Sequence, residues 1–118
     1  MLEWVIIVEI AVLENSNWDS FVNKKITLVI FEKSDCEQCK ILSNEIISDA
    51  GDYNFDICKL RLDAPGSSKI KLDNPWISNI DILPFCVVFK EGQMTDSWAS
   101  SDFAKIILRV NSDKLRSP

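Results

Sequence analysis

The sequence predicts an α/β fold in which strands and helices alternate along one domain. Segments with the continuous or alternating apolar pattern of strands are followed by segments whose apolar residues recur at the helical period. The 118 residues suffice for a single hydrophobic core, and 47% hydrophobic with 26% charged residues is typical of a packed protein. We therefore expect residues 1–118 to form one domain, with a frayed tail at 111–118.

The first elements along the chain are a strand, a short helix and a second strand. Residues 2–13 are apolar except for two glutamates and suit a strand, and the polar run 15–17 can cap a helix that starts at Trp18. Residues 26–32 form an almost unbroken apolar run rich in β-branched side chains, as a strand buried on both faces requires. We expect 26–32 to be a central strand.

A second helix and a third strand follow the central strand. Ser34 or Asp35 can cap a helix that begins near Cys36, and Gly51 ends it. Residues 55–63 alternate well enough to predict another strand. Cys36 thus lies at the start of a helix that directly follows the central strand.

The second half of the chain predicts an interrupted helix, a hairpin and a final helix. Proline signals at 65 and 75 mean that any helix over 69–80 is broken. The later elements are a strand at 85–89, a turn at 90–92, an antiparallel partner at 94–98, and a helix capped by Ser100 or Ser101.

Charge and hydropathy exclude several classes of function. The chain carries 13 basic against 18 acidic residues, without a basic run that could neutralise a phosphate backbone, so we expect no nucleic-acid partner. No window approaches the ~20 apolar residues that span a bilayer, and no basic stretch precedes the apolar start as in an export signal, so we expect no membrane partner. Four cysteines without such a signal favour the reducing cytoplasm.

The informative motif is the pair Cys36 and Cys39, separated by Glu37 and Gln38 at the start of the predicted helix. Cysteines at this spacing can bring their sulfurs to bonding distance, and unpaired N–H groups of the first turn stabilise a thiolate on Cys36. Cys36 would be the exposed nucleophile, and Cys39, one turn deeper, would resolve the mixed disulfide. The motif predicts thiol–disulfide exchange, and we expect no cofactor.

The same motif is also half of a zinc site, which needs two more ligands at suitable spacing. The chain has no histidine, and the remaining cysteines, Cys58 and Cys86, stand singly inside predicted strands. We therefore interpret Cys58 and Cys86 as buried structural residues and disfavour a metal site of four thiolates.

Beyond the cysteine motif, several segments resemble the thioredoxin family in order and spacing over nearly the whole chain. These segments are the strand 26–32, the motif Cys36-Glu37-Gln38-Cys39-Lys40, the run 57–63, Ile82-Leu83-Pro84 and Phe89-Lys90-Glu91-Gly92. The resemblance implies a thioredoxin-like three-layer sandwich, in which a central mixed sheet of four to five strands is flanked by helices. It also implies a monomer that reduces disulfide-containing proteins with electrons from a reductase.

The resemblance further places a substrate groove beside the cysteines. In the family, the proline before the fourth strand follows a cis peptide bond and faces the cysteine pair, and Leu83-Pro84 is similar to this element. The backbone of Leu83 is then expected to pair with an extended substrate, while Pro84 blocks metal capture. The other candidates for substrate contact are Asp35, Glu37, Gln38 and Trp76. For the tryptophan, packing against the sheet is the alternative.

The chain departs from the thioredoxin pattern next to the cysteines. Glu37-Gln38 stands where Gly-Pro is common, and Asp35 where a tryptophan is common. Negative charge on Asp35 and Glu37 disfavours the Cys36 thiolate and opposes the helix dipole. Because a stabilised thiolate makes a dithiol a better oxidant, we expect a reducing couple. A mere helix-start charge is the alternative for Glu37.

A second departure concerns proton transfer. The family's buried acid, six positions before the first cysteine, falls on Ile30, although Lys59 aligns with the lysine that usually accompanies that acid. Glu32 is a candidate substitute, as proton acceptor, if its carboxylate reaches Cys39. A solvated or ion-paired glutamate is the alternative.

Two other functions stay open. One is a binding or adaptor module of the same fold, in which the cysteines are vestigial or regulatory. The other is a glutathione-dependent variant, which we disfavour because no basic cluster for the tripeptide's carboxylates stands out near the cysteine pair.

Overall fold

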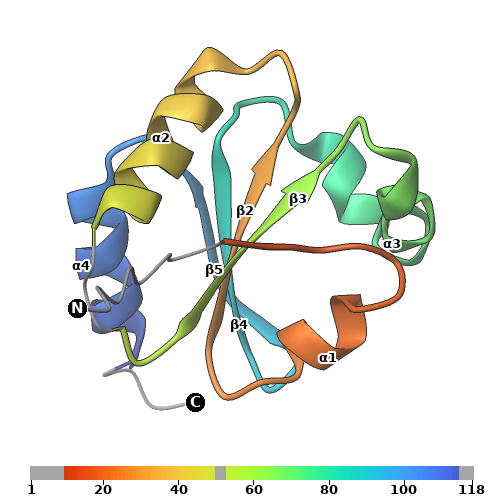
Figure 1. Ribbon diagram of the computed structural model, residues 1–118. Coiled ribbons are helices and arrows are strands. Elements are labelled where there is room, and N and C mark those ends of the chain that lie inside the picture. The colour runs from red at the N-terminus through yellow and green to blue at the C-terminus, as the bar shows by residue number, and fades with distance from the viewer. Residues whose placement is uncertain (1–9, 50–52, 115–118) are drawn as a thin grey trace, which may run out of the picture.

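Strands and helices alternate along the chain in the computed structural model, which describes residues 10–49 and 53–114 (Figure 1). The strands are β1 (Ala11–Val12), β2 (Thr27–Glu32), β3 (Asp56–Arg61), β4 (Phe85–Lys90) and β5 (Gln93–Ala99). The helices are α1 (Trp18–Val22), α2 (Glu37–Ser48), α3 (Ser68–Asp73) and α4 (Phe103–Lys114), with short 3₁₀ helices at Pro65–Ser67 and Pro75–Asn79. The order of elements is the one that the sequence pattern predicts.

The strands form one mixed sheet in the order β1-β3-β2-β4-β5. β1, β3 and β2 are parallel, while β4 runs antiparallel to β2 and β5 antiparallel to β4. Every residue of β2 is buried, because the strand lies at the centre of the sheet with helices over both faces. The prediction that 26–32 is the central strand of a mixed sheet is confirmed.

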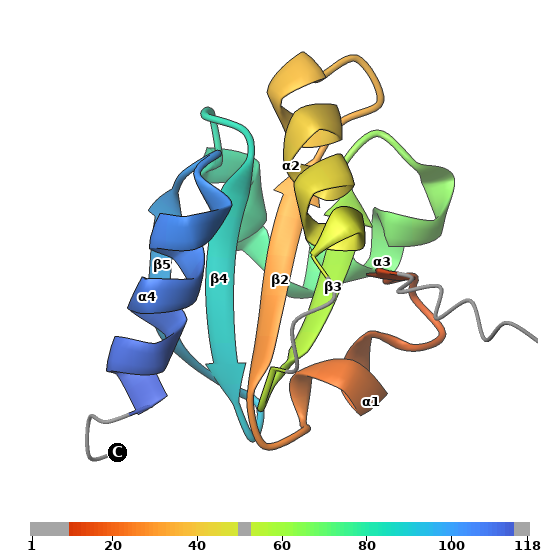
Figure 2. The ribbon, with the colours of Figure 1, turned by 60° about the vertical axis from the view of Figure 1, so that its left-hand side comes forward.

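Two layers of helix cover the sheet, α2 and α4 on one face and α1 and α3 on the other (Figure 1, Figure 2). The side chains of β2 alternate accordingly. Leu28 and Ile30 belong to the core cluster under α2 and α4, and Val29 and Phe31 belong to the cluster under α1 and α3. The expected three-layer sandwich is therefore confirmed.

The ends of two elements differ from the expectation or lie outside the described residues. Of the strand expected over 2–13, the structure has β1 at Ala11–Val12, and residues 2–9 are not among those described. Helix α2 ends at Ser48, and the expected stop signal Gly51 also lies outside the described part of the chain.

The cap of α2 is the clearest correction. Cys36, rather than Ser34 or Asp35, is the N-cap, and its sulfur accepts a hydrogen bond from the Cys39 backbone N–H at 3.2 Å. Ser34, one of the expected caps, instead donates its hydroxyl and its backbone N–H to the carboxylate of Asp63. A contact between distant parts of the chain thus overrides the local capping signal.

Helix α4 also differs from the expectation at its start. Asp102, instead of the expected serines, accepts the Lys105 backbone N–H at 3.2 Å, and the Ser100 hydroxyl accepts from the Asp102 N–H. The helix continues to Lys114, and residues 115–118 of the tail that we expect to fray lie outside the described part of the chain. Neither α4 nor any other helix in the described part of the chain is long and apolar enough to span a membrane.

The segment between β3 and β4 is interrupted as the sequence predicts. Asn74 separates α3 from the 3₁₀ helix at Pro75–Asn79, and its side-chain amide donates to the Ile70 carbonyl at 2.9 Å. Strands β4 and β5 then form the predicted antiparallel hairpin.

Candidate active site

The cysteine pair follows the carboxyl end of β2, and residues 33–35 form the connecting loop. The Ser34 backbone N–H donates to Asp63, just beyond β3, at 3.1 Å, and the Ser34 hydroxyl donates to the same carboxylate. These hydrogen bonds hold the pKa of Asp63 below its usual range, so the carboxylate is charged at neutral pH. The loop that presents Cys36 is thereby tied to the end of the neighbouring strand.

Cys36 and Cys39 form a disulfide bond, with their Cα atoms 5.3 Å apart. The two residues differ in access to solvent. Cys36 is half-buried, whereas Cys39, in the first turn of α2, is 1% exposed. The sulfur of Cys36 is therefore the one open to a partner.

The start of α2 sets the electrostatics around Cys36. The Cys39 N–H points at the Cys36 sulfur, and the positive end of the helix dipole favours negative charge there. Asp35 and Glu37 are exposed and act in the opposite direction. Glu37 lies 3.9 Å from the Lys40 ammonium, but both side chains are exposed, so this ion pair offsets little of the carboxylate's charge.

Three of the predicted substrate-contact residues line one pocket, and one of them stands between the two cysteines in the sequence. The peptide bond between Leu83 and Pro84 is cis, as the resemblance implies. Gln38, Leu83 and Pro84 line one pocket of about 180 Å³, which extends to the end of β5. Asp35 and Glu37 are exposed next to Cys36 and do not line this pocket.

Trp76 lies away from that pocket. Its ring packs edge-on against Phe31 of the central strand, with the ring centroids 5.7 Å apart. The half-buried side chain also lines a different pocket, where Phe85 and Met94 are among its neighbours. In the structure, therefore, Trp76 packs against the sheet, which is the alternative interpretation of this residue.

Glu32, the candidate proton acceptor, is the last residue of β2 and is 5% exposed. Its Oε1 accepts a hydrogen bond from Arg61 Nε at 3.3 Å and lies 3.8 Å from Lys59 Nζ. Ile30, at the position of the family's acid, is buried in the apolar cluster under α2 and α4. Glu32 is therefore ion-paired, and it lines a pocket against α2.

A basic pocket beside the cysteine loop is the main feature that sequence reasoning missed. Lys33, Lys40, Lys59 and Arg61 line a pocket of about 210 Å³ together with Glu32. The premise that no basic cluster lies near the cysteines is therefore wrong. In the sequence, Lys33 and Lys40 flank the motif. Lys59 and Arg61 are two apart in a predicted strand and so share one of its faces, but nothing in the sequence places these two groups together.

The other two cysteines are buried in the sheet. Cys58 belongs to the cluster under α1 and α3, and Cys86 to the cluster under α2 and α4, so the sheet separates them. Burial raises the pKa of each thiol to about 12. Among the described residues, no group of three or more cysteine, aspartate or glutamate side chains is arranged to hold a metal ion.

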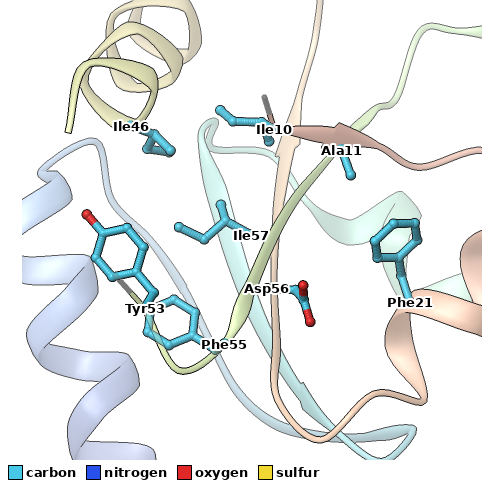
Figure 3. A pocket seen from close by; sticks show the side chains of 8 residues that line it. All are labelled: Ile10, Ala11, Phe21, Ile46, Tyr53, Phe55, Asp56 and Ile57. Atoms are coloured by element: carbon cyan, nitrogen blue, oxygen red, sulfur yellow. The ribbon is translucent and has the colours of Figure 1, made fainter. Parts of the chain in front are cut away.

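A pocket of about 210 Å³ at the opposite end of β3 from the cysteines has a different character (Figure 3). Its walls come from β1, α1, α2 and β3, and Asp56 is the charged residue among mainly apolar side chains. Ile10 and Tyr53, which line it, adjoin residues outside the described part of the chain. We assign no site to this pocket.

Comparison with known sequences identifies a relative. No protein-family model matches the chain. A thioredoxin of Staphylococcus haemolyticus is 31% identical over 84 residues, which cover 70% of this chain and 75% of that protein. This identity and coverage are sufficient to establish a family relationship.

Solved structures share the fold. A mutant thioredoxin from Halobacterium salinarum matches with a TM-score of 0.73 at 15% identity, covering 93% of this chain and 95% of that one. A thioredoxin of Malassezia sympodialis matches with a TM-score of 0.68 at 19% identity, covering 94% and 96%. At these identities the structures show the fold alone. Together with the Staphylococcus relative and the Cys36–Cys39 disulfide, they establish that the chain belongs to the thioredoxin family of thiol–disulfide oxidoreductases.

Proposed function

We propose that this protein reduces disulfide bonds in other proteins through Cys36 and Cys39. The observation that carries the proposal is the asymmetry of the pair, a half-buried Cys36 at the N-cap of α2 and a Cys39 in the first turn that is 1% exposed. In thiol–disulfide exchange an accessible thiolate attacks the substrate, and a second thiol then displaces it. The arrangement supports Cys36 as the nucleophile and Cys39 as the resolving cysteine.

The proposed cycle transfers two electrons from the dithiol to the substrate. The Cys36 thiolate attacks one sulfur of the substrate disulfide, forms a mixed disulfide and releases the other sulfur as a thiolate, which takes up a proton. Deprotonated Cys39 then attacks the Cys36 sulfur, closes the Cys36–Cys39 bond and releases the second substrate thiol. A reductase supplies the two electrons and two protons that restore the dithiol.

In this proposal Glu32 accepts the proton that Cys39 loses in the second step. Glu32 is buried at the end of β2, and its carboxylate lines a pocket with Lys40, the neighbour of Cys39 in the sequence. Its ion pairs with Lys59 and Arg61 hold the carboxylate in place. Burial, position and restraint support the role.

The proposed substrate groove is formed by Leu83, Pro84 and Gln38, which line one pocket, and Gln38 stands between the two cysteines in the sequence. An extended substrate segment pairs there with the backbone of Leu83, next to the sulfur that attacks it. Asp35 and Glu37, exposed on both sides of Cys36 in the sequence, contact the same segment and favour a reducing couple. The protein acts as a single-domain monomer in the reducing cytoplasm, where a reductase keeps its dithiol reduced.

A redox titration tests the proposal. The purified protein is equilibrated in dithiothreitol and glutathione buffers, free thiols are trapped, and the modified cysteines are located by mass. Cys36 and Cys39 should open and close together near the value of about −270 mV known for thioredoxin, while Cys58 and Cys86 stay as thiols. A potential at or above about −180 mV would contradict the reducing direction. If the bond forms in no buffer, the adaptor alternative takes the proposal's place.

Two matched variants test the roles of the cysteines. With a protein disulfide such as that of insulin as substrate, Cys39→Ser should accumulate a mixed disulfide through Cys36, because the resolving thiol is gone. Cys36→Ser should form none. Trapping by the Cys36→Ser protein instead would reverse the assignment, and a Cys58→Ala variant controls for effects on the core.

A further inference from the structure

We propose that the basic pocket binds a carboxylate group of the disulfide substrate, so that the protein prefers disulfides that carry carboxylates. The basic pocket is the one lined by Lys33, Lys40, Lys59 and Arg61 around Glu32. The inference rests on the proposed function, because it names a substrate class for the same cysteine pair.

The fold builds this pocket between α2 and the carboxyl ends of β2 and β3. Lys59 and Arg61 stand two apart on β3 and therefore share one face of the sheet. Lys40 comes from α2, which covers that face, and Lys33 comes from the loop that joins β2 to α2. Four cations from three elements thus surround one small space.

Positive charge exceeds negative charge in the lining, although the whole chain has 13 basic and 18 acidic residues. Glu32 faces two cations with a single oxygen, 3.3 Å from Arg61 Nε and 3.8 Å from Lys59 Nζ. Lys33 is exposed and forms no ion pair within the described part of the chain. The lining therefore carries positive charge that Glu32 does not neutralise.

Two further acidic residues contact members of the lining, and each has its partner there. Glu37 lies 3.9 Å from Lys40 in an exposed pair, which an incoming carboxylate can replace at little cost. Asp63 accepts hydrogen bonds from the backbone N–H and the hydroxyl of Ser34, so its negative charge is stabilised by the loop.

The size and the neutral donors of the pocket fit a single anionic group. Its volume of about 210 Å³ is smaller than the ~300–1,000 Å³ of pockets that hold a whole drug-sized ligand. Ser43 and Asn44 add a hydroxyl and an amide that donate to carboxylate oxygens. A carboxylate that is one part of a larger substrate matches both properties.

The lining of the pocket includes sequence neighbours of both reacting cysteines. Ser34 and Lys40, which both line it, lie just before Cys36 and directly after Cys39. A substrate that places a carboxylate in the pocket therefore has its disulfide close to Cys36, and the charge attraction speeds encounter. A small disulfide such as glutathione disulfide has this chemistry, and so does a protein disulfide flanked by aspartate or glutamate.

Exchange rates with charged and neutral disulfides test the inference. The reduced protein is mixed at low salt with glutathione disulfide, which bears carboxylates, or with hydroxyethyl disulfide, which is neutral. In a Lys33→Gln, Lys40→Gln variant the ratio of the two rate constants should fall about 3- to 10-fold, the size expected for two exposed charge contacts. Neither lysine holds Glu32, so the buried ion pairs are kept.

The control is Lys25→Gln, which removes a charge just before β2, at the opposite end of that strand from the cysteines. Its ratio should equal that of the wild type. An unchanged ratio in the double variant, or an equal fall in the control, would overturn the carboxylate site. If the wild type reduces neither of these disulfides nor a protein disulfide such as that of insulin, the proposed function itself fails.

A second experiment separates the two sources of the carboxylate. The Cys36→Ser, Cys39→Ser protein is titrated with glutathione and followed by NMR, and the amide signals of Ser43 and Asn44 should shift. A peptide disulfide flanked by glutamates is compared with its glutamine counterpart in the exchange assay. Shifts with glutathione assign a small-molecule source, and discrimination between the peptides alone assigns a protein source. The absence of both responses would refute the site.

Discussion

Replacing Glu32 with glutamine is the substitution whose effect on the free energy of unfolding the structure constrains best. The carboxylate is 6% exposed, and its Oε1 lies 3.3 Å from Arg61 Nε and 3.8 Å from Lys59 Nζ. At an effective dielectric constant of about 20, unit charges at these separations attract by roughly 4–5 kcal/mol in each pair. Desolvation of the carboxylate and the half-exposed arginine offset most of this attraction. We therefore expect Glu32→Gln to lower the free energy of unfolding by about 1–3 kcal/mol.

Urea unfolding of the oxidised protein, followed by tryptophan fluorescence, measures this change. Double-mutant cycles that combine Glu32→Gln with Lys59→Met or with Arg61→Gln isolate each ion pair. Each coupling energy should be about 0.5–2 kcal/mol. Coupling energies below about 0.3 kcal/mol in both cycles would refute the ion-pair argument.

The same variant separates proton transfer from a structural role. If Glu32 accepts the Cys39 proton, the resolution of the mixed disulfide should slow by about 100-fold and require a higher pH, because solvent must then remove the proton. The first attack, by Cys36, should keep its rate. A resolution step with unaltered rate and pH profile would leave Glu32 as a structural residue alone.

Three other changes have defined outcomes. Gly92→Ala should lower the free energy of unfolding in urea by about 1–2 kcal/mol, because Gly92 has a φ of 86° in the β4–β5 turn. Burial raises the pKa of Cys58 and Cys86 from 9.0 to about 12, so the folded protein keeps protons that the unfolded chain loses. The contribution of the two protonated thiols to the free energy of unfolding is therefore complete below pH 9.0 and is lost as the pH rises toward 12. Urea unfolding at a series of pH values measures this loss, with the double variant Cys58→Ala, Cys86→Ala as the comparison. Asp35→Asn with Glu37→Gln should make the redox potential about 10–40 mV less negative in the glutathione titration, and an unchanged potential would mean that these charges do not act on the sulfur.

The fold could be predicted from the sequence because its signals are local. The apolar run 26–32 requires burial on both faces, and in the structure it is the central strand with every residue of β2 buried. The spacing of Cys36 and Cys39 at a helix start also follows from neighbouring residues, and the two form a disulfide there. Periodicity was sufficient wherever one segment determined its own structure.

Features that depend on two distant segments could not be predicted in the same way. Ser34 is a good capping residue by type, but its side chain bonds to Asp63, and Cys36 is the residue that caps α2. The basic pocket arises because β2 and β3 pair in parallel, which brings Arg61 opposite Glu32. Neither contact has a signal within a single window of sequence.

The register of β2 and β3 explains how the chain keeps an acid beside Lys59 without the family's acid at position 30. Ile30 lies opposite Lys59, and Glu32 lies opposite Arg61. Residues two apart in a strand share a face, so Glu32 stays on the side of α2 but lies about 7 Å further along the strand. From there its carboxylate still reaches Lys59 at 3.8 Å and gains Arg61 as a second partner.

This displacement moves the acid toward the end of β2 from which the cysteine loop begins. The two cations that hold Glu32 also line the basic pocket, so the proposed proton acceptor and the proposed carboxylate site share Lys59 and Arg61. Changes at these two residues should therefore alter both the resolution step and the preference for acidic disulfides. A change at Lys33, which lines the pocket but is not one of the two ion-pair partners given above for Glu32, should alter the preference and leave the resolution step intact.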